Sequence, residues 1–166
     1  GVLLAKTILH NFSAEYFISF WNQYPGSLAS LFLYPFGYDF LSTISFLTFG
    51  FNNLAARIPS FLLSCLLIFA TYLLGKELFN KKIGLLAAML IAFNPFFIIL
   101  GNLALVDLPV VTFITFSLYF CHKAIRENKT SVWIYAGLFA ALAGFMKPPG
   151  FIIVPFLFLM VFYYKG

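Results

Sequence analysis

Charge is what this sequence has least of. Charged residues make up 9% of the 166 residues, and Asp and Glu together number five. A soluble domain carries about 25% charged residues, so the composition excludes a chain that has water as its only solvent. Hydrophobic residues make up 63%, and 24 Phe lead an aromatic content of 21%. Because such residues favour hydrocarbon, the composition predicts a multi-pass α-helical membrane protein, with the lipid bilayer as its surroundings.

The sequence also lacks the short motifs that bind phosphates or metals in many enzymes. It contains no GxxxxGK[ST] loop, no HExxH and no paired CxxC motif. His10 and His122 are isolated, so no histidine-based metal cluster is indicated. No cofactor is predicted, and the sequence leaves open whether a divalent metal is required. Cys65 and Cys121 lie within or at the end of apolar runs, which predicts two small buried hydrophobes. The net charge of +5 comes from dispersed Lys and Arg, so nucleic acid is not an expected partner.

Apolar runs fill residues 57–166, which we interpret as the transmembrane region. A helix needs about 20 apolar residues to cross the bilayer core. The run 83–121 contains one charge and is too long for one helix, so it predicts two, with a turn near Asn94 and Gly101. With the runs 58–75, 131–146 and 151–164, the sequence predicts an all-α bundle of about five spans.

Residues 1–56 have a different pattern, because Pro and Gly interrupt every apolar stretch. A spanning helix over residues 40–51 would be too short. We therefore predict that residues 1–56 form a first outer loop with short interfacial helices.

The basic residues predict the orientation of the spans. Alternating spans place seven of the ten Lys and Arg on one side, and Lys6, Arg57 and Lys147 on the other. Since cytoplasmic loops carry the excess of Lys and Arg, the second side faces outward or to the lumen. Asp107 is expected at that face as well.

Ionisable groups in or beside the bilayer are the candidate site residues. A carboxylate at the start of an apolar run, such as Asp107, costs a few kcal/mol unless it is paired or wetted, which favours a functional role. The alternative is a helix-start acid stabilised by the helix dipole, with Pro109 in the first turn. Lys147 lies beside two prolines, where it could hold a phosphate or act as a snorkelling lysine. The fork of Arg57 suits phosphate but also a simple interface anchor. Asp39 is a loop acid in aromatic surroundings, which more often has no catalytic role.

Four stretches in order resemble one class of membrane enzyme. Ala56-Arg57-Ile58-Pro59-Ser60-Phe61 is similar to an "RLPS" helix start, and residues 73–88 to a first cytoplasmic loop and its following helix. Residues 105–109 resemble the acidic start of a later helix, and residues 141–150 a "GLAFLTKP" segment. Together, over about residues 30–164, they resemble the protein-mannosyltransferase and aminoarabinose-transferase-like families, which are GT-C type glycosyltransferases.

The resemblance implies transfer of a sugar from a polyprenyl or dolichyl phosphate to a hydroxyl on protein, lipid or glycan, with inversion. It implies an acidic general base in the first outer loop, with Asp107 as the second outer acid and Arg57 and Lys147 as the cations at the phosphate. Where the family often has a basic residue before Pro-Pro, this chain has Tyr34, so Tyr34 and Asp39 are the polar candidates for substrate binding in that stretch.

The family's paired acidic motif would fall at or before Gly1. We therefore expect the chain to be the N-terminal part of a larger enzyme, inactive alone, in a prokaryotic plasma membrane rather than the endoplasmic reticulum. A transporter or lipid flippase is the alternative, and a structural subunit is a third. A transport path needs its acids at the middle of the bilayer, whereas a transferase needs them near one face.

Overall fold

The computed structural model describes residues 36–165, and every regular element among them is helical. The elements are α4 (Gly37–Phe49), α5 (Asn53–Leu78), α6 (Lys81–Ala92), α7 (Pro95–Gly101), α8 (Asp107–Glu127), α9 (Thr130–Met146), a 3₁₀ helix η1 (Pro148–Ile152) and α10 (Ile153–Lys165). The all-α prediction is confirmed for this part of the chain. Tyr34 and most of the predicted outer loop lie outside the described residues.

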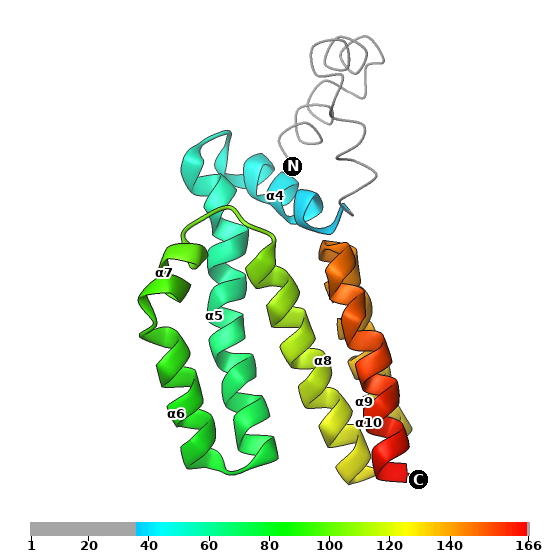
Figure 1. The fold of residues 1–166 in the computed structure, drawn as a ribbon. Helices are drawn as coiled ribbons and strands as arrows, with labels where there is room; N and C mark the ends of the chain where they lie inside the picture. The colour runs from blue at the N-terminus through cyan, green and yellow to red at the C-terminus, as the bar shows by residue number, and fades with distance from the viewer. Residues whose placement is uncertain (1–35, 166) are drawn as a thin grey trace, which may run out of the picture.

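The long helices form a bundle in which successive helices run in opposite directions (Figure 1). Helices α5, α6 and α8 stand side by side, and α9 and α10 pack on the α8 side. Helix α4 lies across one end of the bundle and contacts α5 and α9. We call this end the Asp107 end, because it carries Asp39, Arg57, Asp107 and Lys147. The opposite end, the lysine-rich end, carries Lys76, Lys81, Lys82, Lys123, Arg126 and Lys129. This division is the one that the basic residues predicted.

Two helices, α5 and α8, are long and apolar enough to cross a membrane. Helices α6 and α7 together pass the same test, but a bend of 67° separates them, so they form a third span only if the bent pair counts as one. Helices α9 and η1–α10 are apolar but shorter. The structure therefore supports two or three spans, and the count of five, like the interfacial position of α4, stays a prediction.

Asparagine side chains define where three of the helices begin. The side chains of Asn52, Asn80 and Asn94 accept hydrogen bonds from backbone N–H groups at the starts of α5, α6 and α7, at 2.8–3.2 Å. Each cap satisfies a donor that has no partner within its helix. Pro95 follows Asn94 directly, and the chain bends at this point. The expected turn near Asn94 is therefore a bend between two helices.

The charged segment 122–129 lies between the apolar runs 83–121 and 131–146. Helix α8 continues to Glu127, and the chain turns at Asn128, whose φ of 50° lies in the left-handed region. A helix does not have to end where its apolar run ends, because charged side chains beyond the hydrocarbon can pair with one another. Glu127 lies 3.3 Å from Lys129 and 4.0 Å from Lys123.

Small residues and hydroxyl groups bring the helices together. Gly75 of α5 and Gly84 of α6 meet so closely that a Cβ on either would lie under 3 Å from backbone atoms of the other helix. The buried Thr112 hydroxyl in α8 donates to the Leu63 carbonyl of α5 at 3.0 Å, and to that of Leu108 in its own helix at 2.8 Å. Such contacts drive helix association in lipid, where apolar side chains gain little by meeting one another.

The two cysteines differ in their surroundings. Cys121 is buried as expected, but Cys65 is exposed on the surface of α5, so the prediction of a buried thiol was wrong there. A hydropathy pattern indicates that a residue lies in the membrane, but it does not show whether the residue faces lipid or protein.

Candidate functional site

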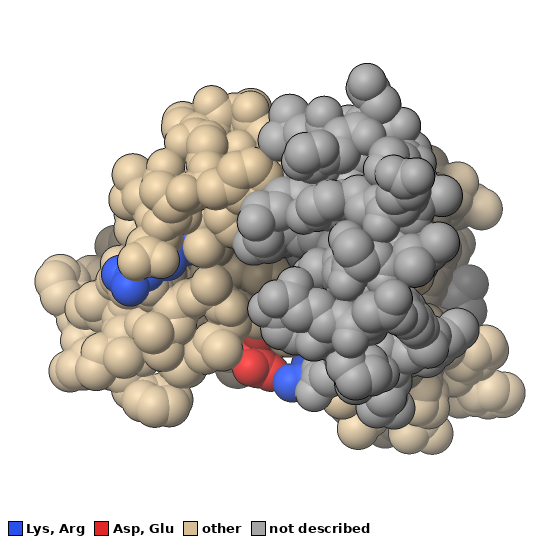
Figure 2. Space-filling view, turned by 90° about the horizontal axis from the view of Figure 1, so that it is seen from above, with Lys and Arg blue, Asp and Glu red and all other residues tan. Residues whose placement is uncertain are grey.

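Two of the candidate residues meet at the Asp107 end. The Nζ atom of Lys147 donates a hydrogen bond to Oδ1 of Asp107 at 2.7 Å, although 40 residues separate them in the sequence. The Lys147 side chain is 27% exposed and that of Asp107 is 55% exposed, so another molecule can reach the pair. Figure 2 shows acidic and basic atoms side by side on this face.

The backbone explains how each partner reaches this position. Asp107 is the first residue of α8, with Pro109 in the first turn, so the helix dipole also favours its carboxylate. Lys147 is extended after α9 ends, and two prolines then begin η1. Its backbone N–H donates to the Ala143 carbonyl at 3.2 Å, and its carbonyl accepts from Gly150 at 2.8 Å. The proline break therefore leaves these backbone groups of Lys147 satisfied.

The other candidates are not part of this pair. Arg57 is exposed on the first turns of α5 and makes no ion pair with an acidic residue in the described part of the chain. Asp39 lies in the first turn of α4, a short helix within the predicted outer loop, and its carbonyl accepts a hydrogen bond from Thr43 at 2.7 Å. Tyr34 lies outside the described residues.

A hydrogen-bond chain at the Asp107 end was not predicted from the sequence. The Tyr38 hydroxyl of α4 lies 2.7 Å from Oγ of Ser60 in α5, and Ser60 Oγ donates to the Leu105 carbonyl at 2.9 Å. Burial raises the pKa of Tyr38 above its usual 10.0, although hydrogen bonds to Ser60 and Ser42 act in the opposite direction. Tyr38 is therefore protonated at neutral pH. Ser60 of the "RLPS"-like motif was the one residue of this hydrogen-bond chain that the sequence analysis had named.

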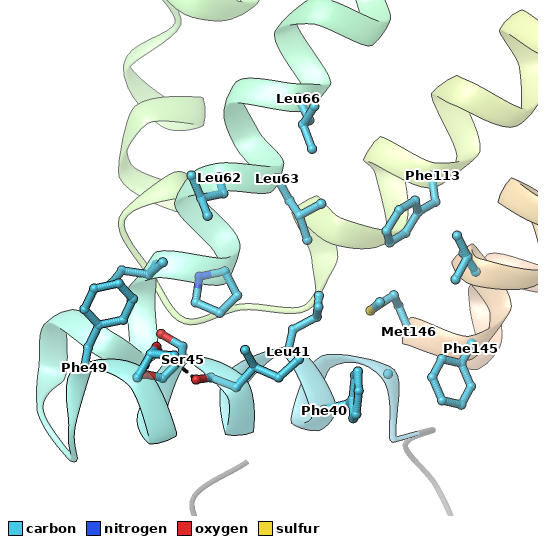
Figure 3. Close-up of a pocket in the computed structure, with 16 residues that line it drawn as sticks. Phe40, Leu41, Ser45, Phe49, Leu62, Leu63, Leu66, Phe113, Phe145 and Met146 are labelled. Atoms are coloured by element: carbon cyan, nitrogen blue, oxygen red, sulfur yellow. Dashed lines mark hydrogen bonds between the residues drawn. The ribbon is translucent and has the colours of Figure 1, made fainter. Parts of the chain in front are cut away.

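An apolar groove of about 690 Å³ lies beneath α4, between it and helices α5, α8 and α9 (Figure 3). Phe40 and Leu41 of α4 face Leu63, Phe113 and Met146 across it. This volume falls within the 300–1,000 Å³ that is usual for small-molecule sites.

The groove offers no free polar hydrogen to an occupant. The hydroxyl groups that line it belong to Ser45 and Thr48. Ser45 donates to the Ala55 carbonyl at 2.6 Å, and Thr48 donates to two carbonyls of its own helix, each at 3.0 Å. Phe145 and Met146, which line part of the groove, directly precede Lys147 in the sequence. The groove is therefore suited to a hydrocarbon chain.

A second charged cluster occupies the lysine-rich end. Nη1 of Arg126 lies 2.9 Å from Oε1 of Glu77, whose side chain is only 10% exposed, and Nδ1 of His122 lies 3.9 Å from the same oxygen. These contacts join α5 to α8. Within residues 36–165, no three His, Cys, Asp or Glu residues come close enough to hold a metal ion.

Comparison with known proteins agrees with these features. Residues 34–165 match the dolichyl-phosphate-mannose-protein mannosyltransferase family. The putative mannosyltransferase YkcB of Bacillus subtilis is 30% identical over 105 residues, which are 63% of this chain and 14% of that protein. No solved structure matches. Because the family match covers most of the chain and the helices are apolar, this chain belongs to an integral membrane protein of the dolichyl-phosphate-mannose-protein mannosyltransferase family.

Proposed function

We propose that the full-length gene product is a membrane glycosyltransferase that moves a sugar from a polyprenyl- or dolichyl-phosphate donor to a hydroxyl of an acceptor. The observation that carries the proposal is the 2.7 Å contact between Asp107 and Lys147 at the end of the bundle. In such a pair the carboxylate can accept the proton of the acceptor hydroxyl, and the ammonium group can stabilise the leaving phosphate. The family match supports the same reaction class.

In the proposed reaction the acceptor oxygen forms a bond to the anomeric carbon, and the bond from that carbon to the phosphate oxygen breaks. The carboxylate accepts the hydroxyl proton, or aligns the acceptor for a second acid to do so. The cationic Lys147 stabilises the charge that develops on the leaving phosphate, and Arg57 supplies a second cation. The resting ion pair neutralises both groups. Arrival of the phosphate at Lys147 releases the carboxylate of Asp107 for the acceptor.

The apolar groove supports a lipid-linked donor. Its lining has satisfied hydroxyl groups and otherwise apolar side chains, so it suits a polyprenyl chain better than a sugar. Phe145 and Met146 of its lining directly precede Lys147, the proposed phosphate ligand, in the sequence. Asp39 and Tyr34 stay candidate substrate-binding residues in this proposal, and the site faces the outer or lumenal side by the distribution of basic residues.

The transporter alternative gains no support from the described residues. A transport path needs charged groups near the middle of the bilayer. Asp107 instead begins α8, and Lys147 follows the end of α9, so both lie at one end of the bundle.

The test is a transfer assay on the purified full-length gene product with polyprenyl-phosphate sugars. We expect Asp107→Asn and Lys147→Ala each to lower kcat by about 100-fold or more. Lys129→Ala is the matched control, because Lys129 also pairs with a carboxylate but lies at the lysine-rich end. Transfer that survives both site variants, or a folded protein that uses no such donor, contradicts the proposal.

A substitution in the groove tests the lipid separately. Ile44→Trp places a larger side chain in the groove and should raise KM for a long-chain donor, while a donor with a short chain should be affected much less. Equal effects on both donors would show that the lipid lies elsewhere.

A further inference from the structure

Two hydroxyl groups connect α4 and α5 to the segment that precedes Asp107. Ser60 has one hydroxyl hydrogen, and it points to the Leu105 carbonyl at 2.9 Å. The 2.7 Å contact between Tyr38 and Ser60 must therefore use the Tyr38 hydrogen, with Ser60 Oγ as the acceptor. Ser60 is fully buried, so water does not compete for these bonds. The chain is thus Tyr38 to Ser60 to Leu105, with each donor assigned.

The Leu105 carbonyl lies two residues before Asp107, in the short connection between α7 and α8. Among residues 36–165 the backbone of that connection makes only local bonds, such as Leu105 N–H to the Leu103 carbonyl at 2.9 Å. The hydrogen bond from Ser60 ties this connection to the long helix α5. On its other side Asp107 contacts Lys147. Two sets of polar contacts therefore hold the short segment 105–107, one from α4 and α5 at Leu105 and one from Lys147 at Asp107.

We propose that Tyr38 and Ser60 are positioning residues that set the location of the Asp107 carboxylate through the Leu105 carbonyl. The expected effect of these two residues on sugar transfer rests on the proposed function. Their expected effect on the Asp107–Lys147 ion pair rests on the geometry alone. The hydrogen bonds of Tyr38 and Ser60 within the described residues go to groups other than Asp107 and Lys147, and neither side chain lines the apolar groove. Their loss should therefore lower kcat more than it changes KM for the donor.

The size of the effect follows from which bonds are lost. Ser60→Ala leaves the half-buried Leu105 carbonyl without its hydroxyl donor. An error of about 1 Å in a reacting group can lower a rate by up to about 100-fold. Tyr38→Phe keeps the shape of the ring and the bond from Ser60 to Leu105, so we expect a smaller fall, by a factor of about 3–10. Thr115→Val is the matched control, because its hydroxyl donates only to the Val111 carbonyl of its own helix at 2.8 Å.

A double-mutant cycle with Asp107→Asn separates positioning from general damage to the fold. If Ser60 acts through Asp107, Ser60→Ala should lower kcat in the wild-type background and have almost no further effect in Asp107→Asn. Equal effects in both backgrounds would overturn the proposal. Should Ser60→Ala fail to fold, Tyr38→Phe in the same cycle gives the answer, because it leaves no cavity.

A second readout does not depend on transfer. Modification of Lys147 by an amine-reactive reagent, followed by mass spectrometry, reports whether its amine is paired. We expect Ser60→Ala to raise the rate of Lys147 labelling towards that of Asp107→Asn, and Tyr38→Phe to raise it less, with Lys129 unchanged as the internal reference. Wild-type labelling in both hydroxyl variants would overturn the inference even if the protein transfers sugar. If labelling of Lys147 rises in a protein that transfers no sugar, the positioning role of Tyr38 and Ser60 stands and only the proposed function is contradicted.

Discussion

Replacing Gly84 by Ala should separate α6 from α5 at the lysine-rich end. A Cβ on Gly84 would lie 2.6 Å from both the Lys76 nitrogen and the Tyr72 oxygen, and both are backbone atoms that cannot rotate away. The two helices must therefore move apart. Overpacking of this kind typically costs about 1–3 kcal/mol. Part of this loss is offset, because Ala favours the helix over Gly by up to about 1 kcal/mol.

Gly137→Ala supplies the control that removes the helix propensity from the comparison. Gly137 is also helical, in α9, but a Cβ there would meet nothing within 4 Å. We expect this variant to be as stable as the wild type or more stable, and Gly84→Ala to be less stable than Gly137→Ala by about 1–3 kcal/mol. Unfolding of the purified protein in detergent, followed by circular dichroism, measures the difference. Equal stability of the two variants would refute the close approach of α5 and α6.

Three further perturbations test other contacts. Thr112→Val removes the hydroxyl that joins α8 to α5 and should destabilise the protein by about 0.6–1.7 kcal/mol. Thr115→Val breaks only a bond within α8 and should change stability by less. Equal losses of stability in the two variants would contradict the role of the interhelical bond. Arg126→Met leaves the Glu77 carboxylate without its 2.9 Å partner and should cost about 1–3 kcal/mol in the same unfolding assay, part of which Glu77→Gln should restore in the double variant. Burial raises the pKa of Tyr38 above 10.0, so its contribution to stability should be complete below pH 10 and decline as the pH rises past the pKa of Tyr38 in the folded protein. Tyr38→Phe should lack this alkaline decline. The same pH profile of stability in wild type and variant would contradict the prediction.

Much of the fold could be predicted because its signals are local. An apolar run and its flanking charges report the transfer of one segment from water to lipid, and this term does not depend on what the segment packs against. The extent of α9 agrees with its apolar run, whereas α5 extends beyond the run 58–75 at both ends. The basic residues of the described helices divide between the two ends as expected. The end of α8 could not be read in this way, because its last turn lies beyond the apolar run, where Ala124 is buried and Glu127 pairs with Lys123.

Composition and local pattern were enough to predict the helical class, the membrane surroundings and the candidacy of Asp107, Lys147 and Arg57. The meeting of Asp107 and Lys147 at 2.7 Å, with Arg57 outside the pair, could not be predicted without the packed helices. The reason is that a contact between residues 40 positions apart depends on how α8 and α9 pack and where the prolines after Lys147 turn the chain. The same holds for Ser60: its motif marks the start of a helix, but its partner is a carbonyl 45 residues away, which only the packed bundle brings within reach.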